Sequence, residues 1–157
     1  MSICRINIST IIIANKKELK KVRWLTKKEL ISTISIDGIT TIGSHAFFGS
    51  NELHTIKLPH SIEFIGTYAF YNTDKLQSIT LGKNIENIGV NNPFTGCTNL
   101  KTITVENDNQ HFSFEDGCLF DKNRTKLITY LPSNTRESYT IPESVIEIGK
   151  VSFHPTN

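Results

Sequence analysis

Side chains able to catalyse a reaction or bind a metal ion are few in this 157-residue chain, and they do not cluster along it. Its three cysteines are odd in number and widely spaced, which argues against a disulfide framework and against a zinc site with closely paired ligands. Motifs for serine nucleophiles, metallopeptidases, phosphate loops and dinucleotide binding are absent. We therefore predict no catalytic residue, no metal site and no cofactor. The residues considered are His45, His54, His60, His111, His154, Cys4, Cys97, Cys118 and the turn pair Glu115-Asp116.

Hydroxyl side chains form a regular polar pattern, at two positions of a short motif in which apolar and polar residues alternate. If the motif is a strand, its polar positions lie on the outer face of a sheet and build two columns. Threonine suits exposed strands, so one interpretation is strand propensity alone. The other is a flat, nearly uncharged face that binds a ligand. The ten positions are Thr33, Ser35, Thr55, Lys57, Ser78, Thr80, Thr102, Thr104, Ser138 and Thr140.

A repeated hexapeptide, Ile-Gly-x-x-Ala-Phe, indicates which architecture must carry those columns. It occurs at residues 42–47 and 65–70, 23 residues apart, and in altered form at 88–94 and 148–153. Self-similarity at such a period is typical of a solenoid of stacked coils. Each glycine fits a tight turn that a side chain would obstruct. The phenylalanines expected to stack as a column inside the solenoid are Phe47, Phe70, Phe94 and Phe153.

A second motif, Leu-x-x-Ile-x-Leu, follows the hexapeptide, and its last three positions alternate as in a strand with one buried face. Such strands are too short to form hairpins alone, so each must pair with the same strand of the neighbouring coil. We predict a repeat solenoid, α/β to mainly β in class, with a parallel sheet of one short strand per coil of about 23 residues. Short helical or 3-10 turns are expected on the opposite face.

The unit from Leu58 to Leu81 resembles the leucine-rich repeat of the BspA-like surface antigens of anaerobic bacteria and of parasitic protists such as trichomonads. It reads Leu-Pro-x-x-Ile-x-x-Ile-Gly-x-x-Ala-Phe, then five residues, then Leu-x-x-Ile-x-Leu. The resemblance extends from Ile31 onward and departs from the pattern at residues 91–93. It implies a non-enzymatic cell-surface or extracellular protein that binds protein partners, such as host matrix or cell-surface proteins. With no clear signal peptide or membrane segment in the sequence, a cytoplasmic scaffold is the alternative, as is a fragment of a longer repeat protein.

The 23-residue period fails between Val105 and the next strand-like stretch, residues 139–141. Two apolar segments, 118–120 and 127–130, flank a polar turn in this interval and predict a β-hairpin island. We therefore expect one domain over 1–157. It comprises regular repeats at 31–105, a hairpin island at 106–138 and an incomplete final repeat at 139–157.

The N-terminal segment 8–30 is expected to be a diverged hairpin island or an N-terminal cap. Counting back from Ile42 as from Ile148, residues 12–13 and 22–24 fall where the two strands of the later hairpin lie. A helix is the alternative for residues 8–24, because Leu19, Val22 and Leu25 recur at a spacing of three.

Charge and hydropathy argue against a nucleic-acid-binding protein and against a membrane-spanning one. A net charge of +2 is too small to indicate a nucleic-acid partner, and the basic residues between 16 and 28 fit a solvated face better than a phosphate-binding patch. No stretch approaches the ~20 apolar residues that cross a bilayer.

Since no polar cap follows Phe153, we expect a longer repeat array or end-to-end self-association.

Overall fold

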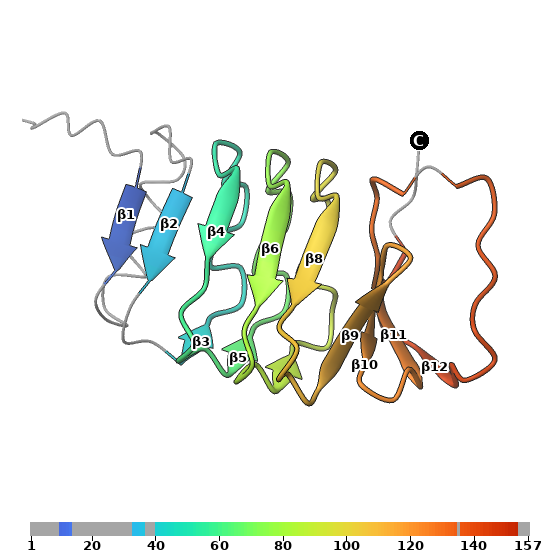
Figure 1. The fold of residues 1–157 in the computed structure, drawn as a ribbon. Coiled ribbons are helices and arrows are strands. Elements are labelled where there is room, and N and C mark those ends of the chain that lie inside the picture. Colours follow the sequence, from blue (N-terminus) through green and yellow to red (C-terminus); the bar gives the residue numbers. More distant parts are fainter. Residues whose placement is uncertain (1–9, 14–32, 37–39, 135, 154–157) are drawn as a thin grey trace, which may run out of the picture.

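The computed structural model describes residues 10–13, 33–36, 40–134 and 136–153, which form a row of stacked coils followed by a hairpin sheet (Figure 1). One strand from each coil enters a five-stranded, all-parallel sheet in the order β1-β2-β4-β6-β8, which we call the main sheet. The predicted parallel sheet is therefore confirmed. Its strands are β1 (Thr10–Ile13), β2 (Thr33–Ile36), β4 (Thr55–Lys57), β6 (Ser78–Leu81) and β8 (Thr102–Val105).

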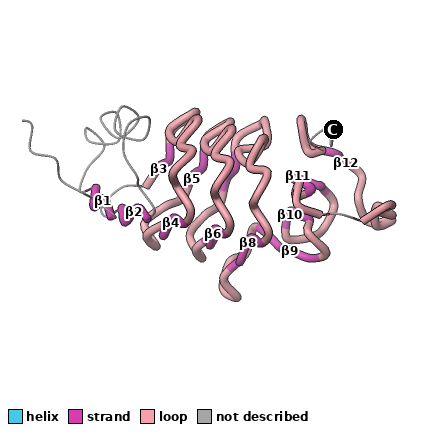
Figure 2. The backbone as a smooth tube through the Cα atoms, turned by 90° about the horizontal axis from the view of Figure 1, so that it is seen from above, coloured by secondary structure: helices cyan, strands magenta, loops and turns pink. Residues whose placement is uncertain are grey.

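A second parallel sheet runs along another side of the coils, as the view from above shows (Figure 2). Its strands are β3 (Thr41–Ile42), β5 (Phe64–Ile65) and β7 (Asn87–Ile88). They hold the isoleucine of the hexapeptide. Ile42 and Ile65 are fully buried between the two sheets, so each coil contributes one inward residue from each side.

The Ala-Phe stretches form consecutive turns, and the described residues contain no helix, which corrects the expectation of short helical turns. The backbone N–H of Ala46 donates to Gly43 O within its own coil, whereas that of Phe47 donates to Ala69 O of the next coil. His45 and Tyr68 also lie in the left-handed region, with φ of 58° and 53°. Alternate N–H groups thus bond between coils, and a continuous helix cannot form.

A column of phenylalanine rings fills the interior of the coils. Phe47 stacks on Phe70 with ring centroids 5.1 Å apart, and Phe70 stacks on Phe94 at 5.8 Å. Burying each such ring contributes roughly 1.5–3 kcal/mol. Phe153 does not join the column: it is 42% exposed, and its ring lies 5.4 Å from that of Tyr130.

The irregular segment folds into the expected hairpin and one further strand. Strands β10 (Cys118–Asp121) and β11 (Lys126–Tyr130) pair antiparallel, as predicted. On its other side β10 pairs antiparallel with β9 (Phe112–Glu115), which was not anticipated. The last strand, β12 (Glu147–Ile148), pairs in parallel with β11. We call the sheet of β9 to β12 the island sheet.

Two strand predictions outside the regular repeats have different outcomes. Residues 139–141 do not form a strand, so that prediction is wrong; the Tyr139 ring packs against Tyr130 of the island sheet instead, 5.2 Å away. At the N-terminus, β1 pairs in parallel with β2, 23 residues further along, which is the relation between repeat strands. The other strand proposed for the N-terminal hairpin, residues 22–24, lies outside the described residues, as does the alternative helix.

Candidate functional site

The outer face of the main sheet aligns the hydroxyl residues as the repeat predicts. Thr33, Thr55, Ser78 and Thr102 are successive partners across neighbouring strands, and Ser35 pairs with Lys57 as Thr80 does with Thr104. Between the polar positions of β4, β6 and β8, Ile56, Ile79 and Ile103 point inward and are buried, for example Ile79 with 1% of its surface exposed. Thr55, Thr80, Thr102 and Thr104 are exposed, and Ser78 is half-buried. We call this strip the hydroxyl face.

Ser138 and Thr140 are separate from the hydroxyl face. Both are exposed, but they lie in the connection between β11 and β12 of the island sheet and not in a strand of the main sheet. The column also begins earlier than expected, because Thr10 pairs with Thr33. The 23-residue spacing from Thr10 to Thr33 was the signal that could have located this strand.

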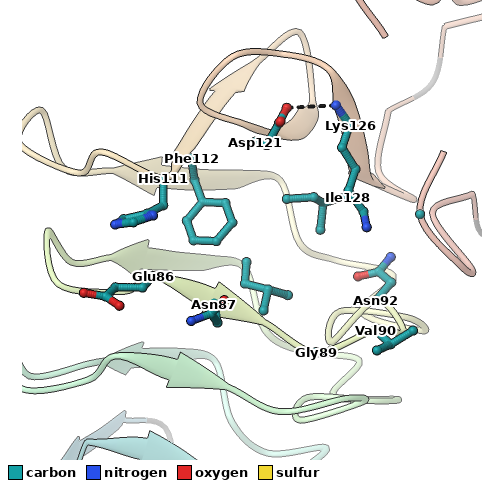
Figure 3. Close-up of a pocket in the computed structure, with 12 residues that line it drawn as sticks. Glu86, Asn87, Gly89, Val90, Asn92, His111, Phe112, Asp121, Lys126 and Ile128 are labelled. Atoms are coloured by element: carbon teal, nitrogen blue, oxygen red, sulfur yellow. Dashed lines mark hydrogen bonds between the residues drawn. The ribbon is translucent and has the colours of Figure 1, made fainter. Parts of the chain in front are cut away.

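A cavity of about 290 Å³ lies where the second sheet ends and the island sheet begins. Figure 3 shows β7, with Asn87 and Gly89, on one side of the cavity and Phe112 and Ile128 on the other. Phe112 is buried, whereas Ile88 and Ile128 are partly exposed. The cavity therefore has an apolar floor. Its more polar rim is formed by Glu86, Asn87, His111, Asp121 and Lys126.

Two charged side chains of the rim, those of Asp121 and Lys126, interact with other groups of the protein. Burial alone would raise the pKa of Asp121, but hydrogen bonds from the Thr125 hydroxyl and from the backbone N–H groups of Lys126 and Thr125 outweigh it and lower the pKa. The Lys126 Nζ forms an ion pair with Glu147 Oε1 at 2.5 Å. Asp121 therefore stays ionised and fixes the turn between β10 and β11.

Aromatic side chains gather at the turns of two neighbouring coils, a feature that the sequence analysis did not single out. Phe48 stacks on Tyr71 with centroids 5.3 Å apart, and the Tyr68 ring contacts both Tyr71 and His45. Phe48 is exposed. These positions recur at the same 23-residue spacing, Phe48 with Tyr71 and His45 with Tyr68, which is the signal that could have revealed them.

The two described cysteines serve packing. Cys97 is buried, its thiol donates to Phe70 O at 3.1 Å, and burial raises its pKa to about 12. The expected packing role, at the position that Ser50 and Thr73 occupy in earlier coils, is confirmed. Cys118 is also buried, and burial raises its pKa. Within the described ranges, no three His, Cys, Asp or Glu side chains are grouped so that they could hold a metal ion.

The described segments include no helix with the length and apolarity needed to cross a bilayer.

The fold is similar to that of solved bacterial proteins. A pneumococcal vaccine antigen, PcpA, is 30% identical, with a TM-score of 0.56 over 80% of this chain and 43% of that protein. A leucine-rich cell surface protein from Faecalibacterium prausnitzii is 27% identical, with a TM-score of 0.66 over 78% of this chain and 38% of that protein.

A leucine-rich repeat protein from Eubacterium ventriosum shares the fold at 19% identity, with a TM-score of 0.53 over 92% of this chain and 50% of that protein. The chain thus spans half or less of the length of each of these structures. No curated protein sequence matches it. The model of the BspA type leucine-rich repeat region matches residues 24–136 in six copies. With its repeats, its parallel strands and this match, the chain belongs to the BspA-type leucine-rich repeat family.

Proposed function

We propose that this protein binds other proteins through the hydroxyl face and acts as a non-enzymatic adhesin at the cell surface. The observation that carries the proposal is the alignment of Thr and Ser residues across successive parallel strands, among which Thr55, Thr80, Thr102 and Thr104 are exposed. Hydroxyl groups both donate and accept hydrogen bonds, and they cost less to desolvate than charged groups. A strip with few charges suits the centre of a protein interface, where charged residues are depleted.

The surface location is supported by relatives. The vaccine antigen and the cell surface protein described above have the same repeat architecture. A membrane-impermeant biotin reagent applied to intact cells should label the protein. Labelling only after lysis would contradict the surface location and favour a scaffold inside the cell.

The hydroxyl face is tested by adding bulk and charge to it. In the variant Thr55→Lys/Thr102→Lys/Thr104→Lys no two of the new lysines face each other on adjacent strands, so direct cross-strand repulsion between them is avoided. The protein would be used as bait on an extract of extracellular-matrix proteins, and captured protein would be quantified. We expect capture to fall at least several-fold, with little change in the melting temperature.

A matched control carries the same added charge away from the face. Ser44, Thr98 and Asn123 are exposed and lie outside the main sheet, so Ser44→Lys/Thr98→Lys/Asn123→Lys should retain capture. Equal loss in both variants would indicate a general charge effect. Equal capture by both would show that the hydroxyl face is not the binding surface, leaving strand propensity as the reason for its threonines.

A further inference from the structure

The second sheet follows one rule of hydrogen bonding from coil to coil. The N–H groups of the residues just before and just after each strand donate to carbonyls of the preceding coil: Glu86 N to Glu63 O at 2.9 Å, and Gly89 N to Ile65 O at 2.8 Å. The coil before repeats this, since Gly66 N donates to Ile42 O at 2.8 Å. By the same rule, the carbonyls of Glu86 and Ile88 on β7 face the position of the following coil.

The rule breaks after β7 because the island sheet intervenes. The following donors flank β12, and they bond instead to β11 and to Thr125 just before it. Ile146 N donates to Thr125 O, and Gly149 N to Leu127 O, both at 2.8 Å. Among the backbone contacts of the described residues, none donates to Glu86 O or Ile88 O. Strand β7 therefore has an open edge that presents two acceptors.

The burial of side chains indicates independently that the position beside β7 is not filled by a strand of the next coil. The equivalent isoleucines Ile42 and Ile65 are fully buried, yet Ile88 on β7 remains partly exposed. Ile88 lines the cavity of about 290 Å³. Phe112 and Ile128 of the island sheet line it as well (Figure 3). Both an apolar floor and unpaired acceptors thus occur where a strand of the next coil would otherwise lie.

One end of this cavity is closed by the polypeptide itself. Beyond β7, Asn91 pairs in parallel with Lys150, and Asn92 N donates to Lys150 O at 3.2 Å. The Asn92 side-chain amide also donates to Val151 O at 3.1 Å. The ladder between coils therefore resumes there, and the gap is confined to the length of β7.

We propose that this cavity binds a short extended peptide segment of a partner protein, which occupies the position of the missing strand. Two N–H groups of the segment donate to Glu86 O and Ile88 O, and an apolar side chain between them packs on Ile88, Phe112 and Ile128. Recognition by strand addition obtains affinity from backbone hydrogen bonds and selectivity from a side-chain pocket. The site is separate from the hydroxyl face and does not depend on it.

The test uses a peptide that already makes these contacts inside the protein. The probe is acetyl-Glu-Phe-Ile-Gly-Thr-amide, the sequence of residues 63–67, whose equivalent N–H groups donate to the preceding coil. It would be titrated into protein with labelled isoleucine methyl groups and followed by NMR. We expect saturable shifts at Ile88 and Ile128 and none at Ile148, which lies on the exposed strand β12.

Two controls separate strand addition from general stickiness. A peptide N-methylated at its Glu and Gly positions lacks the two donors and should not bind. Val90 lines the cavity and is 71% exposed, so Val90→Tyr should obstruct the entrance without unfolding the protein and weaken binding several-fold. Ile146→Tyr, at a side chain 86% exposed outside the cavity lining, should bind as the unmodified protein does.

Three results would overturn the proposal. Equal binding of the N-methylated peptide would mean that backbone acceptors play no part. Shifts at Ile148 in place of Ile88 would assign the peptide to the edge of β12. The absence of any saturable shift up to the solubility limit of the probe would show that the cavity holds only water.

Discussion

At the scale of single residues, the coils use one buried position to tie neighbouring turns together. Thr73 Oγ1 donates to Phe47 O at 2.8 Å, and the thiol of Cys97 donates to Phe70 O in the same way one coil later. Ser50 is equivalent and equally buried, but among the described residues its hydroxyl has no hydrogen-bond partner. Identical positions in the repeat therefore differ in energy, because only some of them satisfy their polar atom.

We therefore predict that substitutions at Thr73 and at Ser50 change the free energy of unfolding by different amounts. Thr73→Val keeps the volume but removes the donor, and we expect it to lower the free energy of unfolding by about 1–3 kcal/mol. Ser50→Ala removes a hydroxyl that pays a desolvation penalty without a bond, so its effect should stay within about 0.5 kcal/mol or be stabilising. Urea denaturation of both variants measures the contrast. Equal losses would show that the hydrogen bond to Phe47 O contributes nothing.

At the scale of elements, the glycine of the hexapeptide allows the coils to approach closely. A Cβ atom at Gly66 would come within 3.0 Å of the backbone of Ser44, and one at Gly89 would meet the backbone of Thr67. Neither glycine has a positive φ, so the constraint is space and not backbone conformation. By contrast, a Cβ at Gly82 would make only ordinary contacts, the nearest at 3.8 Å.

We therefore predict that Gly66→Ala is strongly destabilising and Gly82→Ala is not. The first change forces two stacked backbones apart and should cost about 2 kcal/mol or more, in the range of an overpacked core. The second should change stability by no more than about 0.5 kcal/mol. Thermal unfolding followed by circular dichroism distinguishes them. A Gly66→Ala variant as stable as the parent would mean that the coils are less tightly stacked than the structure shows.

The elements also show how far a sequence can be interpreted alone. Strands β4, β6 and β8 were predictable because each repeats the same alternation, and the hydroxyl face follows from their shared register. The stretch 139–141 alternates in the same way, but partner choice is not local: Tyr139 packs on Tyr130 of the island sheet. The cavity beside β7 could not be predicted for the same reason, because its lining comes from separate segments between residues 86 and 149.

At the scale of the whole molecule, two hydrophobic clusters meet at strand β10. Leu119 belongs to the core of the coils, whereas its neighbours Cys118 and Phe120 point the other way, into a second cluster with Leu127. Because successive side chains of β10 point to opposite faces, this strand packs into both clusters and joins the coils to the island sheet. The segment between β8 and β9 leads into this region, and its residue Asn109 is fully buried.

The Asn109 side chain connects the last regular coil to the island sheet. Its amide nitrogen donates to Gly82 O and Ile85 O at 2.8 and 3.0 Å, and its oxygen accepts from the N–H groups of His111 and Phe112. Removing it leaves four backbone groups without these bonds, and those of Gly82, Ile85 and Phe112 belong to buried residues. Asn99 is the matched comparison, because its amide donates to Asp74 O at an exposed site.

Asn109→Ala should therefore lower the free energy of unfolding by about 2–4 kcal/mol, and Asn99→Ala by less than about 1 kcal/mol. Because coils couple mainly to their nearest neighbours, the loss should be local. In hydrogen exchange, amides of β9, β10 and β11 should lose protection first, while those of β4 and β6 keep theirs. Uniform loss along the chain would instead mean that the coils and the island sheet unfold as one cooperative unit, with Asn109 stabilising both equally.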